Sequence, residues 1–266
     1  MEDLYVLKFG GNAIRGKDGL DRLASDISSL LKTGAKAVLV HGGGPEISEE
    51  MERRGLKPTK VCGVRVTDAD ALEVAETVLR RINSDVVASL EEHGVDAVGI
   101  PGHFCTLCAK KAPMEVSEEG HVRKVDLGLV GEVADVDPTP LRDLLDDGVL
   151  PVIYPIGKDS EGNKLNVNAD TMAAGIAVGI GCTEMVAITD VPGILRDVGD
   201  PSSKIDVLTM DEARALIADG TISGGMIPKV EACINALKAG VGSVRMVDGR
   251  SCGGGALSSG GTVIKR

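Results

Sequence analysis

Aromatic side chains, basic charge and long hydrophobic runs are all scarce in this sequence of 266 residues, and each scarcity excludes a class of protein. Trp is absent, Tyr and Phe occur twice each, and 40 acidic residues against 29 basic ones give a net charge of −11. A nucleic-acid-binding protein needs a basic surface and aromatic side chains on which bases stack. We therefore expect no nucleic-acid partner.

The chain also lacks the segments that direct a protein into or across a membrane. Met1-Glu2-Asp3-Leu4 places acids where a secretory signal peptide carries basic residues before an apolar stretch. The longest uncharged run, Ser251 to Ile264, is glycine-rich and spans about 14 residues, whereas a membrane helix needs roughly 18. These features predict a cytoplasmic protein with no membrane association.

Cysteine is sparse as well. Six cysteines in a chain of this length, without a secretion signal, predict buried small hydrophobic residues rather than a disulfide framework. Cys105 and Cys108 have the spacing of a redox or zinc motif, but no second Cys-x-x-Cys or histidine pair completes a metal site. On a strand, these two side chains would point to opposite faces. We expect a structural role for them and no residues dedicated to a metal ion.

Short apolar runs alternate with amphipathic stretches from end to end. The predicted strands are 4–9, 37–41, 97–100, 130–136, 150–154, 185–189, 244–248 and 262–265. The predicted helices are 20–31, 45–54, 69–93, 139–147, 169–180, 210–219 and 226–239, and the polar stretch 105–125 is predicted to be a hairpin. This alternation predicts an α/β fold whose mostly parallel sheet is covered by helices on both faces.

Glycine clusters follow several of these strands, where ligands of a parallel sheet bind. Gly10-Gly11 follow the first strand, Gly42-Gly43-Gly44 the second, and Asp190-Val191-Pro192-Gly193 the strand 185–189. Bare backbone N–H groups ahead of a helix favour an anion, although turn formation alone is the alternative interpretation. The polar stretch 158–164 is the predicted boundary between two lobes, 1–158 and 159–266.

One common nucleotide-binding motif is nearly matched in this sequence, and another is missing. Gly11 to Asp18 almost fits the P-loop pattern G-x-x-x-x-G-K-[ST], but Asp18 stands where a hydroxyl would hold Mg²⁺. The G-x-G-x-x-G of nicotinamide-dependent oxidoreductases does not follow the first strand. Neither function is therefore predicted.

Three segments carry side chains suited to anionic ligands. Arg65, between polar turn residues, can bind a carboxylate with two parallel N–H bonds. Asn166 to Asp170 lie where a loop becomes a helix, so helix capping is the alternative there. Lys229 lies just inside a predicted helix start, where the helix dipole disfavours a cation. A lysine in that place favours an anionic ligand.

Taken in this order, the segments resemble those of the amino acid kinase family over almost the whole chain. The matching segments are Lys8-Phe9-Gly10-Gly11-Asn12-Ala13, His41-Gly42-Gly43-Gly44-Pro45, residues 63–68, Ile82-Asn83, Val98-Gly99-Ile100, Gly128-Leu129-Val130-Gly131-Glu132, residues 166–170, residues 189–195, Gly225-Met226-Ile227-Pro228-Lys229 and Asp248-Gly249-Arg250. Each segment alone is weak evidence for the family, whereas the occurrence of many of them in the same order is strong evidence.

The resemblance implies an open, mainly parallel sheet of about eight strands between helices, with the acceptor and the dimer contact in the first lobe and the nucleotide in the second. The implied reaction is ATP-dependent phosphorylation of the side-chain carboxylate of N-acetyl-L-glutamate to an acyl phosphate, a step of arginine biosynthesis. Mg²⁺ would arrive on the phosphates of ATP. A homodimer insensitive to arginine is expected, because the first strand begins within a few residues of Met1.

The resemblance also implies roles for individual residues. Gly43, Gly44, Arg65 and Asn166 would bind the acceptor, Lys8 and Lys229 would stabilise the transferring phosphoryl group, and Asp170 would organise both lysines. The implied nucleotide-binding residues are Gly10, Gly11, Asp190, Val191, Pro192, Gly193, Ile194, Leu195, Thr221, Ile222 and Ser223. A carboxylate acceptor has a pKa of about 4.3 and is already ionised, so no general base is needed.

Two alternatives stay open at this point. One is a sister kinase whose glutamate or aminoadipate acceptor is attached to a small acidic carrier protein, received by the basic stretch from Arg53 to Arg65. That stretch is also typical of a solvated helix end. The other is a non-catalytic ligand-binding homologue, against which the presence of both Lys8 and Lys229 argues.

Overall fold

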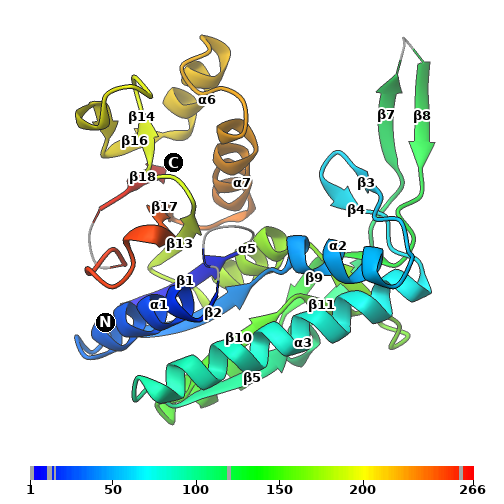
Figure 1. Ribbon diagram of the computed structural model, residues 1–266, viewed down its shortest axis with the longest axis horizontal. Coiled ribbons are helices and arrows are strands. Elements are labelled where there is room, and N and C mark those ends of the chain that lie inside the picture. The colour runs from blue at the N-terminus through cyan, green and yellow to red at the C-terminus, as the bar shows by residue number, and fades with distance from the viewer. Residues whose placement is uncertain (1–2, 11–13, 15, 119–120, 258–259) are drawn as a thin grey trace.

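The computed structural model describes residues 3–10, 14, 16–118, 121–257 and 260–266 (Figure 1). Its centre is an 8-stranded sheet with the order β16-β18-β17-β13-β1-β2-β10-β5. Neighbouring strands are parallel except β17 and β18, which are antiparallel. The predicted open, mainly parallel sheet of about eight strands is confirmed.

The strands of this sheet are β1 (Leu4–Phe9), β2 (Lys36–His41), β5 (Ala97–Pro101), β10 (Leu150–Tyr154), β13 (Glu184–Thr189), β16 (Val207–Thr209), β17 (Ser243–Asp248) and β18 (Thr262–Lys265). The α-helices are α1 (Gly16–Leu31), α2 (Gly44–Arg53), α3 (Ala69–Glu92), α4 (Thr139–Asp146), α5 (Ala169–Ile180), α6 (Met210–Ala218) and α7 (Met226–Ala239). These bounds agree with the predicted helices and strands to within a few residues, except that β16 was not predicted and that the predicted strand 130–136 lies outside this sheet.

The remaining strands form smaller units. A four-stranded sheet contains β6 (Thr106–Lys110), β9 (Val130–Val136), β11 (Ile156–Lys158) and β12 (Lys164–Val167). Two-stranded ribbons are formed by β3 (Lys60–Val61) with β4 (Val64–Arg65), β7 (Met114–Glu118) with β8 (His121–Val125), and β14 (Ile194–Leu195) with β15 (Lys204–Ile205). The predicted hairpin excursion is thus confined to β7 and β8, which project from the rest of the molecule (Figure 1), because β6 pairs with β9.

Alternate residues of the central strands enter two different cores. Leu7 and Leu39 pack with α1 and the end of α3 on one face, whereas Val6 and Val38 pack with α4, α5 and α7 on the other. Because side chains of a strand alternate between faces, strands that are apolar at every position must be covered on both sides. The predicted two-faced burial of the sheet is therefore confirmed.

The strand ends bring the glycine-rich loops together. Phe9, the last residue of β1, pairs with His41 of β2 and Ile188 of β13, and Thr189 pairs with Asp248 of β17. The loops that follow these strands consequently emerge at one edge of the sheet. The N-terminus of α5 reaches the same edge, because a Cβ placed on Gly42 would lie 3.6 Å from the Cβ of Ala169.

The cysteines depart from the predicted burial at two positions, the exposed Cys62 and the partly buried Cys182. All six are free, and Cys105 and Cys108 are both buried in one core, because Cys105 precedes β6 and the alternation of a strand does not apply to it. Burial is wrong for Cys62, which is exposed in the turn between β3 and β4 with φ 47°. This turn belongs to a ribbon of two strands whose tip carries no covering layer.

No helix in the described part of the chain is long and apolar enough to cross a membrane.

Candidate active site

Lys8 and Asp170 form the first of two ion pairs at the carboxyl edge of the sheet. Lys8 extends from β1, and its Nζ lies 2.7 Å from Oδ1 of Asp170 in the first turn of α5. Asn168 caps this helix by accepting hydrogen bonds from the backbone N–H groups of Asp170 and Thr171 at 2.8 and 3.1 Å. Capping therefore accounts for Asn168, and it places Asp170 against the lysine.

Lys229 and Asp190 form the second pair. Lys229 lies in the first turn of α7, and its Nζ contacts Oδ1 of Asp190, the residue that follows β13. The Lys229 ammonium holds the pKa of Asp190 below its usual range, mainly through this hydrogen bond. A carboxylate from another element thus offsets the unfavourable position of a cation at a helix N-terminus.

Both ion pairs line one pocket of about 340 Å³, together with Gly10 and apolar residues of β13 and α7. The four charged groups come from β1, the loop after β13, α5 and α7, which are far apart in the sequence. Two ammonium groups that converge in a pocket can bind a polyanion such as a phosphate.

A second pocket, of about 210 Å³, adjoins the first and shares Lys8, Gly10 and Asp170 with it. Its other lining residues include all four of the predicted acceptor-binding residues, Gly43, Gly44, Arg65 and Asn166. The structure therefore brings the predicted acceptor residues and the predicted catalytic residues into two connected pockets.

Arg65 is a buried cation in the second pocket. Only 7% of it is exposed, and its guanidinium donates hydrogen bonds to the Gly44 carbonyl at 2.9 Å, to Ser48 Oγ at 2.8 Å and to Met51 Sδ at 3.1 Å. Burial lowers its pKa. No carboxylate of the described residues pairs with Arg65, and a buried charge without a counter-ion is unfavourable. This arrangement indicates an anionic ligand.

The glycine loop before α2 is held by close packing. A Cβ on Gly43 would come within 2.6 Å of Ile82 Cδ1 and 3.2 Å of Leu79 Cδ2. Below the loop, His41 is fully buried; its Nδ1 donates to the Gly42 carbonyl at 2.9 Å, and Asn83 Nδ2 lies 3.1 Å from its Nε2. An amide nitrogen only donates, so Nε2 accepts and the imidazole is neutral. Desolvation lowers the pKa of His41 to about 4.

Two further residues, one lining the second pocket and one behind it, were not among the predicted site residues. Lys60, which pairs with Arg65 across the β3–β4 ribbon, lines the pocket and adds a third cation to Lys8 and Arg65. Thr67 is buried and its Oγ1 accepts a hydrogen bond from Asn166 Nδ2 at 3.1 Å. Their sequence signals were weak, because a lone lysine in a ribbon and a lone threonine are common.

The predicted nucleotide-binding residues are more dispersed. Gly10 and Asp190 line the 340 Å³ pocket, whereas Val191 to Leu195 and Thr221 to Ser223 do not. Ile194 is buried, and its N–H donates to Thr262 Oγ1 at 2.8 Å. Thr221 to Ser223 connect α6 to α7, where Ile222 is buried and Ser223 is exposed. Gly11, and with it the start of the near P-loop pattern, lies outside the described residues.

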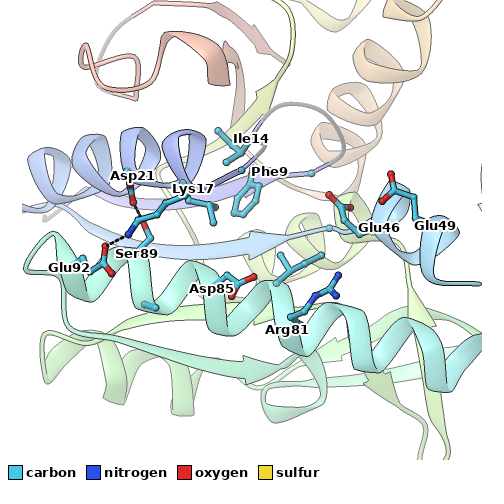
Figure 2. A pocket seen from close by; sticks show the side chains of 16 residues that line it. Phe9, Ile14, Lys17, Asp21, Glu46, Glu49, Arg81, Asp85, Ser89 and Glu92 are labelled. Atoms are coloured by element: carbon cyan, nitrogen blue, oxygen red, sulfur yellow. Dashed lines mark hydrogen bonds and ion pairs between the residues drawn. The ribbon is translucent and has the colours of Figure 1, made fainter. Parts of the chain in front are cut away.

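A larger pocket of about 640 Å³ lies between α1 and α3 (Figure 2) and shares only Gly10 and Gly42 with these two pockets. Its lining has five carboxylates and two cations: Asp21, Glu46, Glu49, Asp85 and Glu92 against Lys17 and Arg81. Lys17 Nζ lies 3.3 Å from Glu92, and Ser89 donates to Asp21 at 3.0 Å. This excess of negative charge disfavours a phosphate, so the pocket does not form part of the candidate site.

The sequence matches the model of the amino acid kinase family over residues 3–248. The chain belongs to this family. It is 42% identical to the acetylglutamate kinase of Methanothermobacter thermautotrophicus, over 92% of this chain and 85% of that protein. It is 43% identical to the acetylglutamate kinase of Heliobacterium modesticaldum, over 92% of this chain and 84% of that protein.

Solved structures of the family share the fold. N-acetylglutamate synthase from Neisseria gonorrhoeae, in complex with coenzyme A and N-acetyl-glutamate, matches 99% of this chain and 59% of its own with a TM-score of 0.80 and 26% identity. Giardia carbamate kinase matches 100% of this chain with a TM-score of 0.70 and 18% identity, which shows the fold alone. This chain therefore has both the sequence pattern and the fold of the amino acid kinase family.

Proposed function

We propose that this protein transfers the γ-phosphoryl group of ATP to the side-chain carboxylate of N-acetyl-L-glutamate, forming an acyl phosphate in arginine biosynthesis. One observation carries the proposal: Lys8 and Lys229 line a pocket that adjoins a second pocket, in which no carboxylate of the described part of the chain pairs with the buried Arg65. The similarity to proteins named acetylglutamate kinase supports the choice of acceptor.

The chemistry of the reaction fits these groups. Phosphoryl transfer through a loose transition state needs in-line positioning and stabilisation of charge on the transferring oxygens. Lys8 lines both pockets, so its ammonium can lie between the acceptor and the phosphoryl group. Arg65 and Asn166 would bind the acceptor, and the acceptor carboxylate is already ionised near neutral pH. Asp170, paired with Lys8, would orient a cation rather than remove a proton.

ATP would bind beyond β13 and α7, with residues 1–158 holding the acceptor together with Asn166, and the rest of residues 159–266 holding the nucleotide. Asp170 and Asp190 each already bind a lysine. Mg²⁺ would therefore be held by the phosphates of ATP, on which it neutralises charge. The loops at Val191 to Leu195 and Thr221 to Ser223 would complete the nucleotide site.

We further propose that the protein is a cytoplasmic homodimer. Its six free cysteines suit a reducing compartment. The last strand of the central sheet, β5, pairs with β10 alone in that sheet, so its outer edge offers unpaired backbone groups to a second copy. Light scattering that returned the mass of a single chain would contradict the dimer.

An acyl phosphate assay tests the proposed reaction. The purified protein is incubated with ATP, Mg²⁺ and one of four acceptors: acetylglutamate, aspartate, carbamate or isopentenyl phosphate. Hydroxylamine traps an acyl phosphate as a hydroxamate, and ADP release is measured in parallel. We expect a hydroxamate from acetylglutamate and none from aspartate. Absence of product from acetylglutamate would overturn the proposal. A carrier-bound acceptor is not favoured, because the relatives above are named for acetylglutamate itself.

A further inference from the structure

Lys229 and Lys8 bind different carboxylates, although both lysines line the same pocket. The Lys229 ammonium contacts Asp190, whereas Asp170 contacts Lys8. Family resemblance assigns the organisation of both lysines to Asp170, and it places Asp190 among residues that touch the nucleotide. The geometry divides this work between two carboxylates instead.

Asp190 is well placed to hold a lysine. It directly follows β13, and the hydroxyl of Thr189 fixes the turn by donating to the Val247 carbonyl and accepting from the Val191 N–H, both at 3.3 Å. Lys229, by contrast, is a long side chain that is 31% exposed and lies in the first turn of α7. The helix dipole and the nearby Lys8 both disfavour its ammonium in the pocket. Without an opposing carboxylate, the ammonium would extend toward water.

The ion pair leaves Lys229 able to bind phosphate. An ammonium has three donors, and the contact with Asp190 occupies one of them. The two remaining donors can bind oxygens of the transferring phosphoryl group. A pair this exposed contributes little to folding stability. Its role is therefore expected to be positional.

We propose that Asp190 is a positioning residue whose carboxylate holds the Lys229 ammonium at the place where the phosphoryl group is transferred, and that it acts through Lys229 rather than by contact with the nucleotide. This inference rests on the proposed kinase activity. It predicts that removal of the Asp190 charge lowers kcat only while Lys229 is present.

A double-mutant cycle tests this dependence. Asp190→Asn, Lys229→Ala and the double variant are assayed with radiolabelled ATP and acetylglutamate. In the wild-type background, Asp190→Asn should lower kcat about tenfold with KM for ATP changed less than about twofold, because coupled residues interact strongly. In the Lys229→Ala background, the same substitution should change kcat less than about twofold. Asp190→Glu, which keeps the charge, should recover part of the lost kcat.

A matched control uses the other end of the sheet. Lys36 at the start of β2 lies 2.8 Å from Asp146, which is 72% exposed and outside both pockets. Asp146→Asn removes a carboxylate from a lysine in the same way and should leave kcat and both KM values unchanged. Thermal unfolding of each variant checks that the fold persists.

The possible outcomes are distinct. Equal losses of kcat from Asp190→Asn in both backgrounds, or a raised KM for ATP in both, would overturn the inference and assign Asp190 to direct nucleotide contact. A wild-type protein that is inactive with acetylglutamate would overturn the proposed function, and the inference with it. An active wild-type protein with additive variants would overturn the inference alone.

Discussion

The proposed acceptor side and the proposed nucleotide side of the candidate site are built in different ways. On the acceptor side, Arg65 is buried and held by three hydrogen bonds, and the loop at Gly43 packs closely against α3. On the nucleotide side, Pro192 and Ser223 are exposed, and Lys229 is held by one carboxylate. The proposed acceptor pocket is therefore held by buried packing and hydrogen bonds, whereas the proposed nucleotide side consists of more exposed residues with fewer contacts.

This difference predicts different consequences of substitution. A closely packed pocket is expected to bind the acceptor equally in the ground state and the transition state, so that loss of one of its contacts raises KM. Groups that meet charge only as it develops lower kcat when they are removed. The following experiments test that division, from the largest expected effect to the smallest.

Removal of the Lys229 ammonium is expected to have the largest effect. Loss of one preorganised donor from an electrostatic site lowers kcat on the order of 10²- to 10³-fold. Lys229→Ala should fall in this range with KM for acetylglutamate little changed, as steady-state kinetics would measure. Lys229→Arg should restore little activity, because a planar guanidinium cannot replace a compact ammonium. Near-normal kcat in Lys229→Ala, with an unchanged circular dichroism spectrum, would make Lys229 an ordinary residue of a helix start.

Acid should destabilise the support of the acceptor loop through His41. Burial lowers the pKa of His41 from 6.5 to about 4, so the unfolded chain binds a proton before the folded protein does. The contribution of the neutral His41 to the free energy of unfolding should therefore be fully present above pH 6.5. The free energy of unfolding should decrease by about 3 kcal/mol as the pH falls toward 4. Urea unfolding at pH 7 and pH 5 measures the part of this decrease that falls between them, about 2 kcal/mol.

The control for His41 is His41→Gln, which keeps a polar side chain but does not titrate. Its stability should fall less steeply between pH 7 and pH 5 than that of the wild-type protein. An identical pH dependence in both proteins would show that other groups, and not His41, cause the loss.

Arg65→Ala should act on acceptor binding. The loss of hydrogen bonds from a buried guanidinium to a carboxylate is expected to raise KM for acetylglutamate about 10- to 100-fold, with a smaller change in kcat. Arg65→Lys keeps the charge without the two-pronged geometry and should lie between the wild type and Arg65→Ala. If KM for ATP rose in place of KM for acetylglutamate, the assignment of the two sides would be reversed.

Ser48→Ala should have the smallest effect. Ser48 Oγ accepts a hydrogen bond from Arg65 at 2.8 Å and so orients the guanidinium without lining the acceptor pocket. Loss of one such bond should raise KM for acetylglutamate about 2- to 10-fold and leave kcat unchanged. Ser84→Ala, on the exposed face of α3, is the matched control and should change neither constant. A fall in kcat for Ser48→Ala would mean that the two sides are coupled.

Much of the fold was predictable because its signals are local. The helix α3, expected at 69–93 and found at Ala69–Glu92, shows apolar residues at helical spacing and begins after Asp68, whose carboxylate accepts from the Ala71 N–H at 2.8 Å. The exposed Cys62 was predicted wrongly, because the burial of a small residue depends on neighbours that a ribbon lacks. The pairing of β6 with β9 was not predicted, because the two strands are distant in the sequence and nothing local marks them as partners.

The candidate site shows the same limit. Gly43, Arg65 and Asn166 were named on family resemblance and converge in one pocket, but their assignment to acetylglutamate stays a prediction. Ser48 and Met51, which accept hydrogen bonds from Arg65, and Thr67, which accepts one from Asn166, were not predicted as site residues. Hydrogen-bond partners of this kind are ordinary residues, and nothing in a sequence marks them until the chain brings them within reach.

By itself, the sequence determined the alternation of strands and helices, the family to which the chain belongs and the types of charged residue available, because hydrophobic periodicity and ordered motifs are properties of neighbouring residues. Only the tertiary structure decided which carboxylate meets which lysine. Asp170 and Asp190 lie 20 residues apart in the chain, yet one pairs with Lys8 of β1 and the other with Lys229 of α7. An ion pair is decided by distance in space, and the crossovers of a parallel sheet set that distance without regard to sequence separation.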